Sequence, residues 1–175
     1  MTSPATARPD PSEFSPVVAD YIALVPPGDL LTILADQAEE LKRLVGGLTD
    51  EQALVHHAPY TWSTKQVLGH LADCERVFGY RAMRVARNDA TPLPGFDENA
   101  YMRAVDFDRW PVGELLEEFA LLRRSHVLLF RYLPDDAWLR SSEVNGHTMT
   151  TRAVACVMAG HMQHHLQILR KRLSD

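Results

Sequence analysis

Apolar residues recur every three or four positions in four long stretches of this 175-residue chain. This spacing puts them on one face of an α-helix, and it predicts helices at about residues 30–46, 64–87, 111–132 and 152–172. No stretch alternates apolar and polar residues over the length that a strand needs. Amphipathic helices of this length bury their apolar faces against one another, so the expected fold is an all-α four-helix bundle.

Long connections separate the expected helices. Residues 88–110 form a connection of about 23 residues, whereas most connections in compact domains have about 4–6 residues. We therefore expect long crossover connections, and residues 88–110 could form a lid or a substrate wall that includes Phe96 and Tyr101. Residues 1–28 are rich in proline and are expected to form an irregular arm, which leaves residues 29–175 as the bundle domain.

The formal net charge of −5 gives the chain no overall attraction to nucleic acid or to an anionic membrane surface. Its apolar runs are shorter than the roughly 18 residues of a membrane span, and no signal peptide is visible at the N-terminus. Two cysteines cannot form a disulfide framework. We therefore expect a cytoplasmic protein whose partner is a small-molecule substrate, with neither nucleic acid nor a membrane as a partner.

Histidines interrupt the apolar stripes of two expected helices. The stripe of the last helix passes through His161 and His165, which are four residues apart and therefore share one face, with His164 at its edge. His70 faces the core from the second helix. Two histidines on one helix and one on another leave coordination positions open, as in catalytic sites. The pattern predicts a divalent metal ion, and zinc, nickel, iron and copper all accept imidazole ligands. Zinc or nickel is our first expectation, with iron or copper as alternatives.

Other residues near these histidines leave alternatives open. A buried histidine is more often a hydrogen-bonded core residue than a metal ligand, so a plain helical scaffold is one of them. His126 and Cys74 are candidates for a fourth ligand, and Asp73 or Glu75 could orient an imidazole. The metalloprotease motif HExxH is absent, because position 162 is Met.

Two arginines also lie near apolar stripes. Arg81 and Arg123 would be partly or fully buried there, and a buried arginine usually has a carboxylate partner. We expect Glu75 or Glu118 to be that partner, in a network that is structural rather than catalytic.

Several segments resemble the DinB-like (YfiT-like) metalloenzymes, in the order in which that family has them. These segments are Trp62-Ser63-Thr64-Lys65, Gly69 to Arg76, Tyr80-Arg81-Ala82, Thr91 to Asp97, and Ala159-Gly160-His161 with His164-His165-Leu166. The resemblance runs from about Tyr21 to the C-terminus. It implies a four-helix bundle with long crossover connections, often dimeric, and a divalent metal held by three histidines, which correspond to His70, His161 and His165.

The resemblance also narrows the function. Some relatives are transferases that join a low-molecular-weight thiol, such as bacillithiol or mycothiol, to an electrophile. We therefore expect a metal-dependent enzyme, either a thiol S-transferase or a hydrolase acting on small electrophiles, that forms a homodimer. Asp73, Glu75, Asp97 or Glu98 could act as the base. The alternative is a non-catalytic metal-binding stress-response protein of the same family.

Overall fold

The computed structural model describes residues 8–174, and four long helices make up its body. These helices are α2 (Leu30–Val45), α4 (Thr64–Ala86), α6 (Val112–Arg131) and α8 (Thr151–Leu173). Each end lies within one residue of the bound expected from the apolar periodicity. The prediction of a four-helix bundle is confirmed, and the structure adds one short two-stranded sheet.

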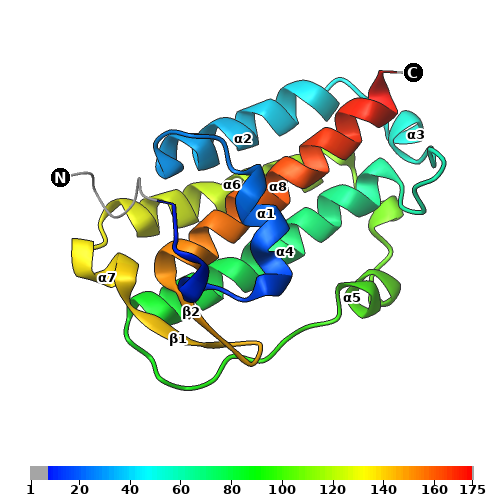
Figure 1. The fold of residues 1–175 in the computed structure, drawn as a ribbon. Helices are drawn as coiled ribbons and strands as arrows, with labels where there is room; N and C mark the ends of the chain where they lie inside the picture. Colours follow the sequence, from blue (N-terminus) through cyan, green and yellow to red (C-terminus); the bar gives the residue numbers. More distant parts are fainter. Residues whose placement is uncertain (1–7, 175) are drawn as a thin grey trace.

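The four helices have an order in space that requires long connections. In Figure 1, α2 and α8 run in one direction, whereas α4 and α6 run in the opposite direction. Both α2 and α4 pack against α6 and α8, so α2 and α4 occupy opposite corners of the bundle. The neighbours α4 and α6 are parallel, which a short hairpin loop cannot achieve. The chain therefore crosses the length of the bundle between them, through α5 (Glu98–Ala104) and the 3-10 helix η3 (Phe107–Arg109).

The remaining elements are short. Residues 8–28, where an irregular arm is expected, contain the 3-10 helices η1 (Pro11–Glu13) and η2 (Pro16–Val18) and the helix α1 (Ala19–Leu24). The division of the chain at residues 28 and 29 stays a prediction. The helices α3 (Asp50–Ala53) and α7 (Asp135–Leu139) lie in the connections after α2 and α6.

The expectation of no strand is wrong for one hairpin. Strands β1 (Ser141–Val144) and β2 (His147–Thr150) pair antiparallel around Asn145 and Gly146. Both turn residues have positive φ, 52° and 76°, which is the geometry that an Asn-Gly pair favours in a two-residue hairpin turn. Strands of four residues are too short to show a clear alternation of apolar and polar residues. The Asn145-Gly146 pair is therefore the sequence feature that indicates this hairpin.

A layer of polar side chains divides the buried core into two apolar clusters. On α2, Leu34 belongs to the first cluster and Leu41 to the second, and the buried Gln37 lies between them. On α6, the buried Arg123 separates the two clusters in the same way. On α8, His161 lies at the same boundary, between Ala159 of the first cluster and Met162 of the second, and His70 and His165 lie beside it among residues of the second cluster. Buried polar groups need partners, so these side chains must contact one another or a bound group.

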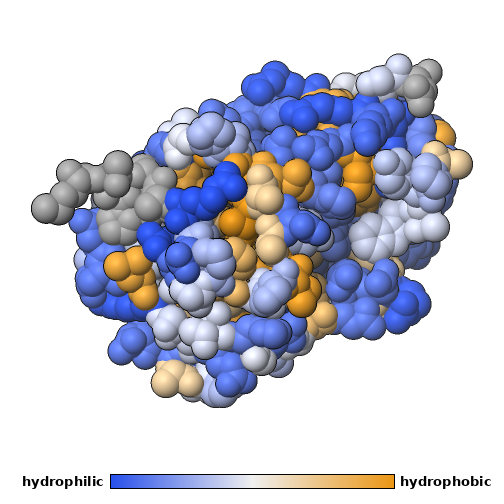
Figure 2. All heavy atoms as spheres, in the orientation of Figure 1, coloured by the Kyte–Doolittle hydropathy of each residue, from blue (hydrophilic) through white to orange (hydrophobic). Residues whose placement is uncertain are grey.

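Helix α1 crosses the middle of α8 at a glycine. A Cβ atom at position 160 would lie 1.9 Å from the carbonyl oxygen of Tyr21. The absence of a side chain at Gly160 therefore allows the backbone of α1 to rest directly on α8. Figure 2 shows apolar side chains gathered on the surface around α1. Among residues 8–174, none of the helices has the length and apolarity of a membrane span.

Replacing Gly160 by Ala is expected to lower the free energy of unfolding by roughly 1–3 kcal/mol, because α1 must move away from α8. Urea unfolding measures this change. Gly113→Ala is the matched control, since no atom lies within 4 Å of a Cβ at that helical position. Its stability should stay unchanged or rise by up to about 1 kcal/mol. Equal stability changes in the two variants would contradict the close packing of α1.

Candidate metal centre

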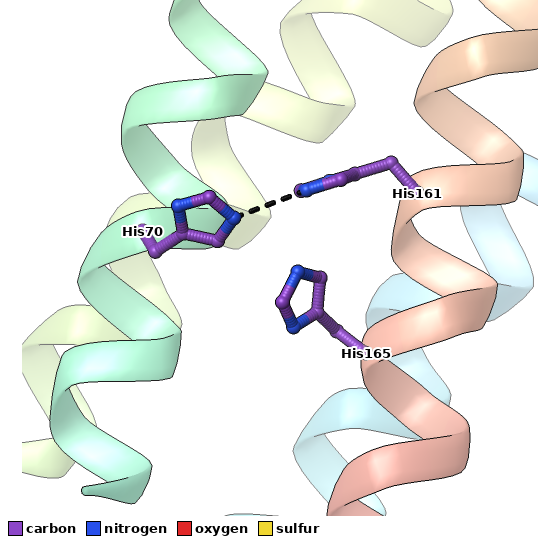
Figure 3. A group of neighbouring side chains, drawn as sticks. All are labelled: His70, His161 and His165. Atoms are coloured by element: carbon purple, nitrogen blue, oxygen red, sulfur yellow. Dashed lines mark hydrogen bonds between the residues drawn. The ribbon is translucent and has the colours of Figure 1, made fainter. Parts of the chain in front are cut away.

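Three histidine side chains converge between α4 and α8. His70 points from α4 toward His161 and His165, which lie one turn apart on α8 (Figure 3). Nε2 of His70 lies 3.1 Å from Nε2 of His161. One ring nitrogen from each of the three side chains lies within 4.8 Å of the other two. Zinc bound tetrahedrally to histidine would hold ligand nitrogens roughly 3.3 Å apart, so this spacing fits a metal ion.

Burial keeps these imidazoles neutral. The exposed fractions of His70, His161 and His165 are 5%, 6% and 7%. Burial lowers the pKa of His70 to about 4. Burial and the neighbouring imidazoles hold the pKa values of His161 and His165 well below the usual value. Neutral imidazoles keep the free lone pair that a metal needs, and Nδ1 of His165 has no hydrogen-bond partner among the described residues.

Helix capping and aromatic packing fix the positions of the three rings. A capping box between Ser63 and Gln66 starts α4, and the side chain of Thr150 caps α8. Aromatic rings then surround the histidines. The ring centroids of Trp62 and His70 are 4.9 Å apart, and those of Tyr21 and His161 are 5.4 Å apart. Because the three histidines are buried, an ion bound here would act in a region of lower dielectric constant than water.

The two candidates for a fourth ligand have different surroundings. Sγ of Cys74 lies 3.6 Å from Nε2 of His70, but Cys74 is not part of the convergent group. Burial raises the pKa of the Cys74 thiol, which keeps the sulfur protonated. Nδ1 of His126 lies 3.0 Å from Oε1 of Glu75, so His126 belongs to a separate polar cluster. His164 is half-buried beside the site and stacks edge-on with Tyr21.

The carboxylates considered as orienting groups have other partners. Asp73 forms an ion pair with Arg76 at 3.6 Å, and burial raises the pKa of Asp73. Glu75 receives two hydrogen bonds of 2.8 Å from the guanidinium of Arg123. The predicted pairing of Arg123 with Glu75 is thereby confirmed. The prediction for Arg81 is wrong, because this side chain reaches the crossover connection and donates to the carbonyl oxygen of Pro94.

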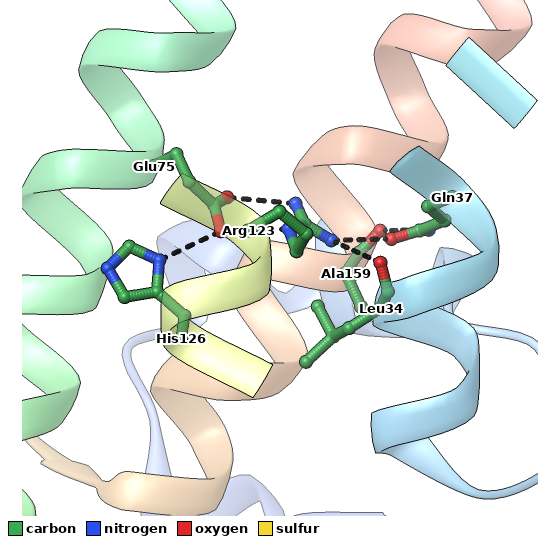
Figure 4. A network of polar contacts seen from close by, with 6 residues as sticks. All are labelled: Leu34, Gln37, Glu75, Arg123, His126 and Ala159. Atoms are coloured by element: carbon green, nitrogen blue, oxygen red, sulfur yellow. Dashed lines mark hydrogen bonds and ion pairs between the residues drawn. The ribbon is translucent and has the colours of Figure 1, made fainter. Parts of the chain in front are cut away.

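The Glu75–Arg123 pair belongs to a network that joins all four long helices (Figure 4). Arg123 also donates to the carbonyl oxygen of Leu34 and to Oε1 of Gln37. Gln37 in turn donates to the carbonyl oxygen of Ala159 on α8, at 2.8 Å. Sequence reasoning missed Gln37, although it interrupts the apolar stripe of α2 at helical spacing. This network satisfies buried polar groups beside the histidine group.

A pocket of about 330 Å³ opens beside His165. Its lining comes from the segment before α4, from the first turn of α4, from α5 and from the second half of α8. The lining residues are Pro59, Tyr60, Thr61, Trp62, Val67, Asn99, His165, Ile168 and Arg172. Sequence reasoning did not single out Asn99 or Arg172 for this role. The crossover connection therefore reaches the pocket through Asn99, as expected for a substrate wall.

The two aromatic residues expected in that wall lie elsewhere. Phe96 and Tyr101 line a second pocket, of about 300 Å³, together with Arg81. None of the three histidines lines this second pocket. Phe78 lies between the second pocket and the three histidines. Its ring centroid is 5.5 Å from that of His161 and 6.4 Å from that of Phe96.

A comparison with protein families agrees with this geometry. The model of the DinB superfamily matches residues 33–169, which contain α4 and α6, most of α2 and α8, and all three histidines. The chain belongs to the DinB superfamily. Among solved structures, this DinB chain is similar to YfiT from Bacillus subtilis, with a TM-score of 0.75 and 20% identity. The similarity covers 96% of this chain and 94% of that chain.

YfiT is described as "a probable metal-dependent hydrolase with an unusual four-helix bundle topology". At 20% identity, the likeness establishes a shared fold for the DinB chain. No curated protein gives a sequence match.

Proposed function

We propose that His70, His161 and His165 hold one divalent metal ion, with zinc or nickel as the expected metal. A divalent ion on these ligands would lower the pKa of a bound water or thiol, so that it attacks a small electrophile near neutral pH. The reaction would be a hydrolysis or the transfer of a low-molecular-weight thiol. The proposal includes a cytoplasmic homodimer that acts on a small-molecule substrate.

The convergence of three neutral, buried imidazoles is the observation that carries this proposal. Two helices supply the three ring nitrogens, which lie within 4.8 Å of one another. Three protein ligands leave a coordination position for a substrate or water. The pocket beside His165 gives a small molecule a route to that position. The family resemblance supports thiol transfer, and the description of YfiT supports hydrolysis.

One observation favours the alternative of a non-catalytic metal-binding protein. Asp73 and Glu75 are paired with Arg76 and Arg123, and neither forms a hydrogen bond with the three histidines in the described part of the chain. A site without an adjacent base can still bind an ion. In that case the family member would act in a stress response through binding alone.

Turnover on two substrate sets distinguishes these functions. We expect the zinc- or nickel-loaded protein to hydrolyse p-nitrophenyl acetate, or to join bacillithiol, cysteine or N-acetylcysteine to monochlorobimane. Its rate should exceed that of the metal-stripped protein by at least about ten-fold. His165→Ala should lose this gain, whereas His164→Ala should keep it. Turnover that is equal with and without metal would contradict an enzyme of this kind, and metal binding without turnover would support the alternative.

A further inference from the structure

The pocket beside His165 contains a buried guanidinium group that has no carboxylate partner among residues 8–174. Arg172 is 5% exposed and lies in the last turn of α8. No Asp or Glu within residues 8–174 forms an ion pair with it. A buried charge that lacks a counter-charge is unfavourable, and burial accordingly lowers the pKa of Arg172. An anion in the pocket would compensate this charge.

Two of the three nitrogens of the Arg172 guanidinium group form no hydrogen bond with the described residues. Nη1 donates to the carbonyl oxygen of Trp62 at 2.8 Å. The planar group lies over the ring of Tyr60, with Cζ 4.3 Å from the ring centroid. Nε is buried and has no hydrogen-bond partner among the described residues. The edge formed by Nε and Nη2 presents two parallel N–H groups, which is the arrangement that binds a carboxylate with two hydrogen bonds.

Arg170 lacks these features, although it lies on the same helix end. Its guanidinium group pairs with Glu40, and both side chains are partly exposed. The basic residues at this helix end are typical of an interaction with the helix dipole. Arg172 departs from that pattern because its side chain turns into the pocket and stacks on an aromatic ring. An interaction with the helix dipole therefore does not explain why Arg172 is buried.

We propose that this pocket binds the carboxylate group of a small substrate, with Arg172 as the pairing residue. Trp62, Val67 and Ile168 supply apolar wall to the pocket, and the amide of Asn99 adds a polar group. The substrate would then be a carboxylate with a small apolar or planar body. A single guanidinium group matches the single charge and planar shape of a carboxylate. Because His165 lines the same pocket, the other end of the substrate would face the three histidines.

This inference rests on the proposed function for the position of the reacting end, and a binding experiment tests it without turnover. Benzoate and benzamide have the same ring and nearly the same size, but only benzoate carries a charge. Calorimetric titration of the zinc-loaded protein should give roughly ten-fold tighter binding of benzoate. The metal-stripped protein should show the same preference, because Arg172 and not the ion recognises the carboxylate.

Substitutions of Arg172 test whether this residue causes the preference for benzoate over benzamide. Arg172→Met should remove it, and Arg172→Lys should keep part of it, because lysine has the charge but not the planar fork. Arg170→Met is the matched control and should behave like the wild type. Thermal unfolding verifies that each variant is folded. If Arg172→Met were poorly folded, the preference of the stripped wild-type protein would still decide the proposal.

The outcomes separate this inference from the proposed function. Equal binding of benzoate and benzamide, or a preference that survives in Arg172→Met, would overturn the carboxylate site. A preference that disappears on stripping the metal would also overturn it, since the ion would then be the binding group. Metal-dependent turnover together with equal binding would reject the carboxylate site alone. A preference that depends on Arg172 in a protein that binds no metal would reject the proposed function alone.

Discussion

Saturating zinc is expected to raise the midpoint of thermal unfolding by roughly 8–16 °C when its free concentration is about 1,000 times its Kd. The reason is linkage, because the three imidazoles converge in the folded state, and the unfolded chain does not hold them together. One ring nitrogen from each of them lies within 4.8 Å of the other two in the folded chain. Differential scanning fluorimetry with and without zinc or nickel measures the shift.

Two variants separate coordination from general metal effects. His161→Ala removes one ligand and should abolish the shift, and elemental analysis should find about one ion per wild-type chain and none in this variant. His164→Ala is the control, because His164 lies next to the site but outside the convergent group. It should keep both the ion and the shift. A wild-type protein that takes up no zinc or nickel would contradict the site and leave a plain helical scaffold with histidines in its core.

Helical periodicity accounts for most of the fold that the sequence could predict. The four long helices bury continuous apolar stripes, so their bounds follow from residue spacing to within one residue. Shorter elements do not repeat a pattern often enough to be read in this way. The helix α1 and the hairpin of β1 and β2 depend on contacts with α8 and the crossover connection. Apolar spacing alone therefore does not predict them, although the Asn145-Gly146 turn is a local signal for the hairpin.

The histidine group could be predicted for the same reason. His161 and His165 are one turn apart and lie on a buried stripe of α8, and His70 lies on the buried face of α4, which packs against α8. Residues whose role depends on a neighbour from another part of the chain were harder to predict. Arg172 has the composition of a helix end, and its burial depends on Tyr60 and Trp62, more than 100 residues away in the sequence.

Replacement of Glu75 by Gln is expected to destabilise the protein by roughly 3–5 kcal/mol, because it leaves the charge of Arg123 buried without a counter-charge. Glu75 is 3% exposed and Arg123 is 1% exposed. Their two hydrogen bonds connect α4 to α6, and Arg123 also contacts α2. The amide of Gln presents donors where the guanidinium needs an acceptor. Urea unfolding at neutral pH measures the loss.

The pH dependence of the free energy of unfolding provides a second test of the Glu75–Arg123 ion pair. Burial alone would raise the pKa of Glu75, but the charge of Arg123 and the hydrogen bonds from His126 and Arg123 outweigh it and hold the pKa below its usual value. A carboxyl group whose pKa is lowered by folding stabilises the protein fully above its unfolded-state pKa. This contribution is lost as the pH falls through the folded-state pKa. The stability difference between wild type and Glu75→Gln should therefore be constant above about pH 5 and narrow below it.

A matched control distinguishes burial from charge itself. Glu118 also forms an ion pair with an arginine between α4 and α6, but both it and Arg76 are partly exposed. Ion pairs at the surface contribute about 0–1 kcal/mol, so Glu118→Gln should cost less than about 1 kcal/mol. A similarly small loss for Glu75→Gln, or a difference that does not narrow in acid, would contradict a buried ion pair at the centre of the bundle. Gln37 links this pair to the carbonyl oxygen of Ala159, two residues before His161. Zinc binding by the folded Glu75→Gln protein therefore tests the role of the network. If the network supports the bundle and not the ion, this variant should still bind zinc.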